Sequence, residues 1–174
     1  LVSSLSLSKG RICVASTRDN QVLLKVNNSI LTECPPMICG GYLRENWGQV
    51  ALENMLGSMV ARDHSYGHWC RGGVGLAQSL QGLSPIQRHG VTLVYEGRLD
   101  NRFDLSANLS VSRDASDGEM MLEAYLRWGV TFARELKGDF ACSVWDSRTQ
   151  NLILTCDSLG KKPLYYCFQN GALL

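Results

Sequence analysis

The side chains that could do chemistry in this chain are its thiols, a few imidazoles and several charged groups near glycine. The sequence has seven cysteines and three histidines, but no Cys-x-x-Cys pair or Cys/His cluster has the spacing of a zinc site. His64, His68 and His89 show no ligand spacing and are expected at the surface or in turns. Most of the cysteines are expected to be small buried residues, since free cysteine is among the most buried types. The sequence therefore indicates no metal centre.

Charged residues occupy three places where a ligand or a helix terminus could use them. Arg62 ends a predicted helix, where its planar guanidinium can hold a carboxylate or interact with the helix dipole. Glu96 and Arg98 flank Gly97 after a predicted strand and can form a simple ion pair there. Asp117 falls in the first turn of another predicted helix, where the dipole favours an acid in any case. The residue types alone leave both binding and structural roles open.

Two amphipathic helices are expected to position these groups. The first covers residues 49–62, because apolar residues recur there at helical spacing: Leu52, Met55, Leu56, Met59 and Val60. The second begins at a capping box formed by Ser116 and Glu119. A short helix over residues 132–137 is expected to end at Gly138.

Strands are predicted over residues 72–78, 91–95, 139–146, 151–157 and 163–168. The later strands are largely apolar on both faces, whereas an antiparallel sheet with one wet face alternates between apolar and polar residues. Each sheet is therefore expected to be covered on both sides. This pattern predicts an α+β fold, a four-layer α/β/β/α sandwich of two antiparallel sheets.

Two stretches carry a family resemblance. Residues 91–101 read VTLVYEGRLDN, and residues 114–166 contain SDGE, LRWG, LKGDFACSVWD and DSLGKKPLYY in that order. Together they resemble the glutaminase half of asparagine synthetases, which are class II glutamine amidotransferases with an N-terminal nucleophile. The resemblance covers about residues 37–166, is strongest after Val91, and implies the Ntn-hydrolase-like version of the predicted sandwich.

The resemblance implies a role for each candidate residue. Cys39 in the sequence MICGG would be the nucleophile, with its own α-amine, which titrates near ~7.7–8.0, as the base. That chemistry needs a cut between Ile38 and Cys39; otherwise Cys39 is an ordinary buried strand cysteine. Arg62 would hold the α-carboxylate of glutamine, and Asp117 its ammonium group.

The same resemblance places the oxyanion hole at Glu96 and Gly97 and matches Asn101 to a later asparagine of the family. Here Glu96 replaces an asparagine, and an ionised carboxylate cannot donate a hydrogen bond. Losing one oxyanion donor costs about 2.7–4 kcal/mol, unless Arg98 serves as a replacement donor. Two further departures are the absence of a Gly-Pro turn after Arg62 and a cysteine, residue 156, in place of an arginine.

The implied function is a glutaminase domain that releases ammonia from glutamine for an ATP-dependent synthetase domain, in cis or in trans, outside this chain. No cofactor is expected in this chain, while ATP and Mg are implied for the synthetase domain. The alternative is a catalytically silent scaffold domain of a β-lactam-synthetase-like or lasso-peptide-cyclase-like enzyme. A free-standing binding module outside the family is the third option.

Composition and the arrangement of apolar residues limit the protein classes and the cellular compartment that we expect. The chain has 174 residues, 45% hydrophobic and 19% charged, with a net charge of +1 and no basic run, which disfavours nucleic-acid binding. No apolar run reaches the ~18 residues of a membrane span, and no signal peptide is recognisable, so a reducing cytoplasm is expected. Residues 1–36 are expected to be a leader, an extension or a small accessory hairpin, or to add a strand to the main sheet. Residues 37–174 are expected to form the amidotransferase domain, cut short at its C-terminal end.

Overall fold

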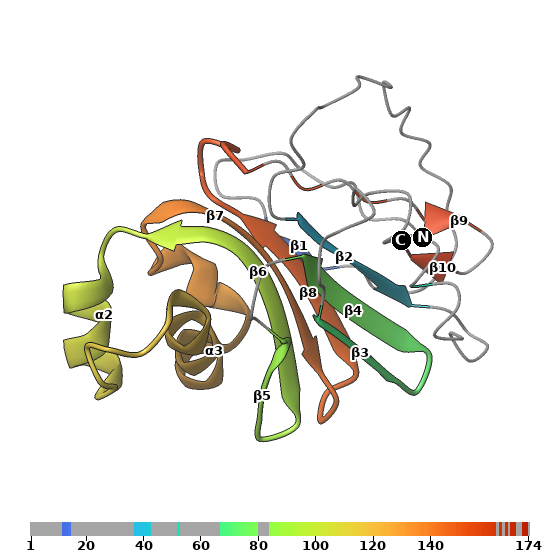
Figure 1. Cartoon of the computed structure of the whole chain (residues 1–174), viewed down its shortest axis with the longest axis horizontal. Coiled ribbons are helices and arrows are strands. Elements are labelled where there is room, and N and C mark those ends of the chain that lie inside the picture. Colours follow the sequence, from blue (N-terminus) through green and yellow to red (C-terminus); the bar gives the residue numbers. More distant parts are fainter. Residues whose placement is uncertain are drawn as a thin grey trace. The chain divides into compact units, whose positions relative to one another are not determined.

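The computed structural model describes residues 12–14, 37–42, 52, 67–79, 84–162, 164, 166, 168–169 and 172–173. These residues form two antiparallel five-stranded sheets with two α-helices (Figure 1). The α+β class predicted from the sequence is confirmed, and its elements are those of an Ntn-hydrolase-like sandwich. The chain divides into two compact units: unit 1 holds Leu1–Ser16 and Ile86–Leu164, and unit 2 holds Thr17–Pro85 and Tyr165–Leu174.

The sheet of unit 1 has the order β1-β8-β7-β6-β5, with β1 (Ile12–Val14), β5 (Ile86–Arg88), β6 (Val91–Leu99), β7 (Gly138–Asp146) and β8 (Asn151–Cys156). Its longest ladder joins β6 and β7 from Val91 opposite Asp146 to Leu99 opposite Gly138. Residues that alternate along these strands are buried on both faces: Leu93 and Val144 on one, Val94 and Trp145 on the other. The sequence pattern of two apolar faces predicted this arrangement.

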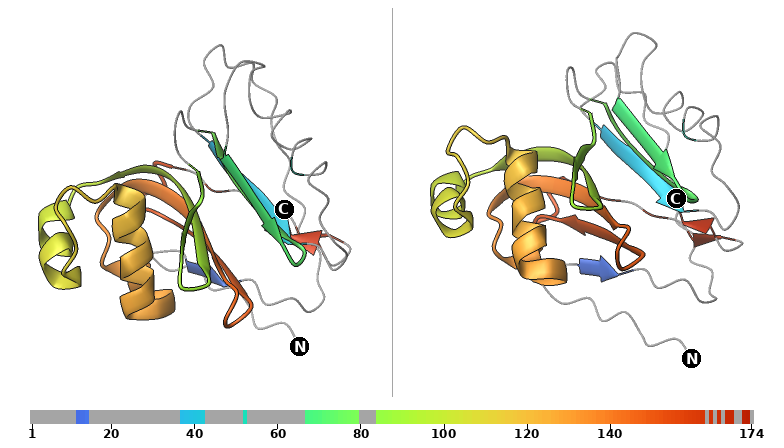
Figure 2. Two further views of the ribbon diagram at one scale, coloured as in Figure 1. Left: turned by 60° about the horizontal axis from the view of Figure 1, so that its bottom comes forward. Right: turned by 90° about the horizontal axis from the view of Figure 1, so that it is seen from below.

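Helix α3 (Asp117–Trp128) lies across one face of this sheet (Figure 2). It begins at Ser116 with the predicted capping box, in which the Ser116 hydroxyl accepts from the Glu119 N–H and Glu119 accepts from the Ser116 N–H. The helix approaches the sheet closely at Gly118, where an added Cβ would lie 2.3 Å from the Ile86 side chain and 2.4 Å from the Tyr95 ring. A larger residue at that position would push α3 off the sheet.

Unit 2 contains a sheet of order β3-β4-β2-β10-β9, made of β2 (Met37–Tyr42), β3 (Gly67–Arg71), β4 (Val74–Ser79), β9 (Phe168–Gln169) and β10 (Ala172–Leu173). Strand β2 pairs along its length with β4, and the two backbones approach closely at Gly40. A Cβ there would lie 2.4 Å from the Gly75 carbonyl oxygen. The predicted helix over residues 49–62 lies outside the described residues except for Leu52, which is helical and buried.

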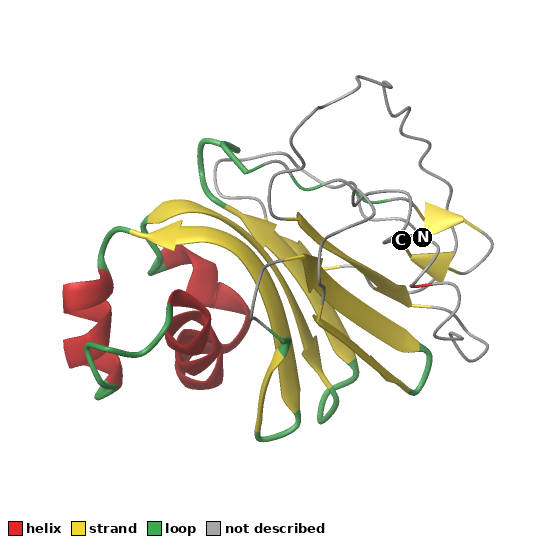
Figure 3. Ribbon diagram, viewed as in Figure 1, coloured by secondary structure: helices red, strands yellow, loops and turns green. Residues whose placement is uncertain are grey.

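Several predicted boundaries were wrong, for local reasons (Figure 3). Gly72 and Gly73 form the turn between β3 and β4 at φ 58° and 83°, so β4 begins at Val74. The expected helix over residues 132–137 is instead a 3-10 helix, η1 (Gly129–Arg134). Gly138 does not cap it but opens β7, where an added Cβ would lie 2.2 Å from the Arg98 carbonyl oxygen.

The prediction from the sequence missed one helix and misplaced one strand. Helix α2 (Arg102–Leu109) was not predicted, because only Leu105 and Ser106 are buried on it and it has no regular apolar stripe. The strand expected over residues 163–168 is not formed at Leu164 or Tyr166, and β9 begins only at Phe168.

Ile12–Val14 do form a strand, β1, which pairs antiparallel with β8. The rest of the proposed N-terminal hairpin lies outside the described residues, and a domain boundary after residue 36 stays a prediction. In the part of the chain that the structure describes, each helix is too short or too polar to cross a lipid bilayer.

Candidate functional site

Four of the candidate residues lie in unit 1, around the last third of β6. Glu96, Gly97 and Arg98 are on the strand itself, and Asp117 is the first residue of α3. Asp117 reaches the end of β6, since its Oδ2 accepts a hydrogen bond from the Leu99 N–H at 3.0 Å. The structure therefore gathers these predicted residues at one end of one strand. Cys39 lies in unit 2, and Arg62 is outside the described residues.

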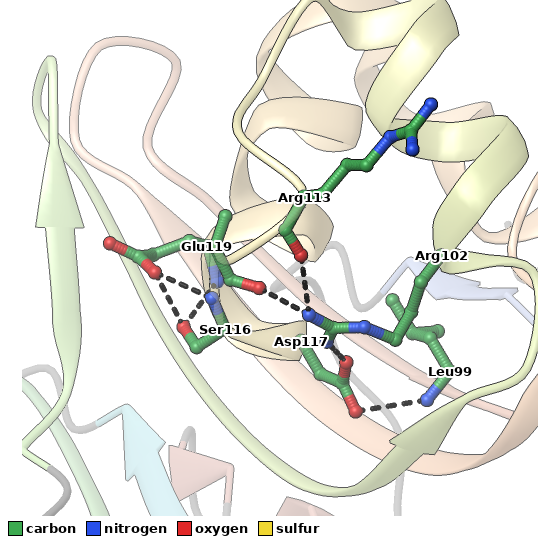
Figure 4. A network of polar contacts seen from close by, with 7 residues as sticks. Leu99, Arg102, Arg113, Ser116, Asp117 and Glu119 are labelled. Carbon is green, nitrogen blue, oxygen red and sulfur yellow. Dashed lines mark hydrogen bonds and ion pairs between the residues drawn. The ribbon is translucent and has the colours of Figure 1, made fainter.

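Asp117 is the centre of a polar network (Figure 4). Its second carboxylate oxygen pairs with the guanidinium of Arg102, which also donates to the carbonyl oxygens of Arg113 at 3.2 Å and Ala115 at 2.6 Å. The network joins the end of β6, the start of α2 and the loop before α3. Both oxygens of Asp117 thus have protein partners, although a carboxylate offers about four acceptor positions. Its predicted contact with a substrate ammonium stays a prediction.

The capping box beside Asp117 fixes the start of α3. Glu119 accepts from the Ser116 N–H at 2.7 Å and from the Ser116 hydroxyl at 2.8 Å. These hydrogen bonds, that of the backbone first, lower the pKa of Glu119. Burial raises the pKa of Tyr95, although a hydrogen bond with the Gly118 backbone opposes that shift.

Glu96 forms an ion pair that the sequence did not indicate. Its Oε1 lies 2.5 Å from Nζ of Lys162, and the two side chains are 14% and 32% exposed. The expected alternative was a pair between Glu96 and Arg98. Arg98 instead lies near Asp139, its direct neighbour across the ladder, at 3.8 Å, and near Asp100 at 3.6 Å.

Lys162 follows a loop organised by Asp157. The Asp157 carboxylate accepts hydrogen bonds from the backbone N–H groups of Leu159 at 3.0 Å, Lys161 at 3.1 Å and Lys162 at 3.1 Å. Burial opposes ionisation of Asp157, but these backbone donors more than offset it and hold its pKa below the usual value. An acid at the end of β8 therefore sets the path of the chain that leads to Lys162.

Gly97 has a structural reason to be glycine whatever its chemistry. Its φ is +112°, and an added Cβ would lie 2.0 Å from the Asp139 carbonyl oxygen. Asn101, the other matched residue, joins β6 to the segment before β7: its amide donates to the Glu135 carbonyl at 2.9 Å and accepts from the Lys137 N–H at 3.0 Å. The oxyanion role of Gly97 stays a prediction, while the scaffold role of both residues is evident.

Cys39 sits in the middle of β2, opposite Ala77 on β4. Its thiol is free and half-buried, and burial raises its pKa to about 11. Because the thiolate is the nucleophile, a raised pKa lowers reactivity at neutral pH. In the chain as given, the nitrogen of Cys39 belongs to an amide and cannot act as a base.

A cavity of about 570 Å³ opens in unit 1 where β7 begins and β8 ends. Its lining includes Leu136, Asp139, Cys156 and Lys161, but neither Glu96 nor Asp117. The predicted substrate-binding residues and this cavity are therefore separate features of unit 1.

Comparisons with known proteins agree with the family motifs. Residues 73–174 match the family model of the glutamine amidotransferase domain. An asparagine synthetase [glutamine-hydrolyzing] 3 of Bacillus subtilis is 33% identical over 87 residues, covering 48% of this chain and 14% of the relative. A putative asparagine synthetase of Mycobacterium tuberculosis is 35% identical over 78 residues, covering 42% of this chain and 12% of the relative. Amidase chyE of Penicillium rubens is 35% identical over 101 residues, covering 55% of this chain and 15% of the relative. The chain thus spans only a small part of the length of these relatives.

Proposed function

Because this chain belongs to the glutamine amidotransferase domain family, we propose that it releases ammonia from glutamine for an amide-forming domain outside this sequence. The observation that carries the proposal is the polar arrangement at the end of β6. There Gly97 and Asp117, two residues matched to the family's substrate site, lie on elements joined by the Leu99–Asp117 hydrogen bond. The relation to asparagine synthetases supports the choice of glutamine as the nitrogen donor.

The proposed reaction is hydrolysis of the glutamine side-chain amide through a thioester intermediate on Cys39. The α-amine of a chain-heading Cys39 takes the thiol proton, and the thiolate attacks the side-chain amide carbon of glutamine. The Gly97 N–H stabilises the oxyanion, the protonated α-amine passes its proton to the amide nitrogen, and the C–N bond breaks to release ammonia. Water then gives a proton to the α-amine and attacks the thioester carbon; the C–S bond breaks, glutamate leaves, and the thiolate takes that proton back. Arg62 and Asp117 bind the two charged ends of the amino acid. The proposed partner domain, in cis or in trans, consumes the ammonia and supplies the ATP and Mg chemistry.

The deciding experiment is controlled cleavage directly before Cys39, within β2, by a protease whose introduced recognition sequence ends at residue 38. Both pieces should stay in the sample, because β1 of the first piece pairs with β8. We expect equal amounts of ammonia and glutamate from the cut protein and none from the uncut chain. Cys39→Ala, cut in the same way, is the matched control. A folded, cut protein without Cys39-dependent ammonia release would contradict the proposal.

A catalytically silent scaffold domain is the second candidate function. Two observations favour it: the carboxylate of Glu96 at the oxyanion position, and the thiol of Cys39 with a pKa of about 11 within a paired strand. For a scaffold, the uncut chain bound to its synthetase partner supports amide formation from free ammonia, and Cys39→Ala has no effect. Dependence of that coupled reaction on glutamine and Cys39 would exclude the scaffold role.

A further inference from the structure

The pair between Glu96 and Lys162 extends the candidate site by one residue. We propose that Lys162 is a catalytic residue whose ammonium group stabilises the oxyanion, at the position where the family has a neutral amide donor. This inference rests on the proposed glutaminase function. If the inference holds, Glu96 is a positioning residue that holds Lys162. Its replacement of the family's asparagine then does more than remove an oxyanion donor.

Proximity is the first argument. Glu96 directly precedes Gly97, whose N–H is the proposed oxyanion donor, and Lys162 Nζ lies 2.5 Å from Glu96 Oε1. An ammonium group has three N–H donors. Glu96 accepts from one of these donors, and the proposal assigns another to the developing oxyanion of the substrate.

Positioning is the second argument, because a lysine side chain is long and flexible. Both ends of Lys162 are held: its backbone N–H donates to Asp157 Oδ2 at 3.1 Å, and its ammonium pairs with Glu96. Asp157 is in turn anchored to the sheet, since its N–H donates to the Phe140 carbonyl at 2.8 Å. Preorganised charge of this kind needs little rearrangement when a negative charge develops.

Solvent exposure is the third argument. Lys162 is 32% exposed and Glu96 14%, so solvent screens their charges less than those of a surface pair. The adjacent residue Lys161 offers a contrast in the same loop. It pairs with Asp139 at 3.0 Å but is 56% exposed. The two lysines share residue type and loop but differ in burial and in the residue that holds them.

The test compares single variants of the cut, two-piece protein in steady-state ammonia release. Lys162→Met should lower kcat about 100-fold with little change in KM, as loss of one oxyanion donor does. Lys162→Arg should restore most of the rate, because it returns the positive charge. Lys161→Met should leave the rate unchanged while removing a comparable surface ion pair. A Lys162→Met protein with wild-type kcat would overturn the inference and leave the proposed function intact.

Glu96→Ala separates the two roles of the carboxylate. If Glu96 holds Lys162, kcat falls; if Glu96 merely opposes the oxyanion, kcat rises, and the inference is wrong. Thermal unfolding of each variant shows whether a lower kcat reflects loss of the folded structure. If it does, the kcat of the Lys162→Arg variant decides. Absence of ammonia release from the wild-type cut protein would overturn the glutaminase function and this inference together.

Discussion

The end of β6 and the strand that carries Cys39 are built in opposite ways. Around β6, charged side chains from β6, α2, α3 and the loop after β8 pair with one another and with backbone groups. Cys39 lies between Ile38 and Gly40 in β2 and faces Ala77 in β4, and burial keeps its thiol protonated. The contrast shows that folding alone brings Gly97 and Asp117, two proposed binding residues, to one strand end, whereas the proposed nucleophile needs a covalent event, the cut before Cys39.

Gly97→Ala should give the largest effect in the β6 region. The new Cβ would meet the Asp139 carbonyl at 2.0 Å with a backbone at φ +112°, so we expect a loss of at least ~3 kcal/mol in unfolding free energy. Urea denaturation of the wild type and the variant measures this loss. The matched control is Gly72→Ala in the β3–β4 turn, also at positive φ (+58°) but facing open space, with an expected loss of about 1 kcal/mol. Equal losses at both positions would mean that the close approach of β7 is not what requires Gly97.

Alkylation of Cys39 tests the second region of the comparison, the strand β2. A pKa raised from 9.0 to about 11 leaves roughly 100-fold less thiolate at pH 8, so the uncut chain should react with iodoacetamide about 100-fold more slowly than a model thiol. Peptide mapping by mass spectrometry follows the modification, and Cys39→Ala identifies the peptide. After the cut, the new α-amine should accelerate the reaction. Rapid labelling of the uncut chain would remove the need for a free α-amine to activate the thiol.

Asp117→Ala should destabilise unit 1 as well as weaken glutamine binding. The substitution leaves the Leu99 N–H without its acceptor and removes the carboxylate partner of the Arg102 guanidinium, which keeps the Arg113 and Ala115 carbonyls. We expect a loss of about 2 kcal/mol in unfolding free energy. Denaturation curves measure this, and Asp114→Ala, at an exposed acid nearby, is the control. If Asp117→Ala raises KM without lowering stability, the Arg102 network contributes nothing to the fold.

A smaller effect is expected from Asp146, which holds the β7–β8 turn. Hydrogen bonds from the Arg148 side chain, more than any other cause, lower the pKa of Asp146 from 3.8 to about 2. The carboxylate therefore stabilises the folded state above about pH 4, and this contribution is lost as the pH falls towards 2. We expect ~1–2 kcal/mol, because Arg148 is half exposed and partly screened.

The measurement for Asp146 is unfolding free energy between pH 6 and pH 2, for the wild type and for Asp146→Asn. The wild-type curve should decline more steeply than that of the variant over this range. Parallel curves would show that the buried carboxylate has no depressed pKa in the folded protein.

Local signals in the sequence were sufficient for some elements. Ser116 and Glu119 specify the start of α3, because a capping box needs only residues three apart. The short, largely apolar runs of residues 139–146 and 151–157 indicate β7 and β8 in the same local way. Helix α2 escaped prediction, since its few buried residues make no periodic signal.

By itself, the amino-acid order determined the family, the α+β class and a strand that begins at Val91. The structure extends this strand from the predicted end at Tyr95 to Leu99, so that it carries Glu96, Gly97 and Arg98. Only the tertiary structure decided the partners of those charges. Lys162 meets Glu96 across 66 positions of chain, and Arg102 meets Asp117 across 15. The physical reason is that pairing depends on which strand ends, loops and helix starts the sheet brings together, and no short-range spacing encodes that.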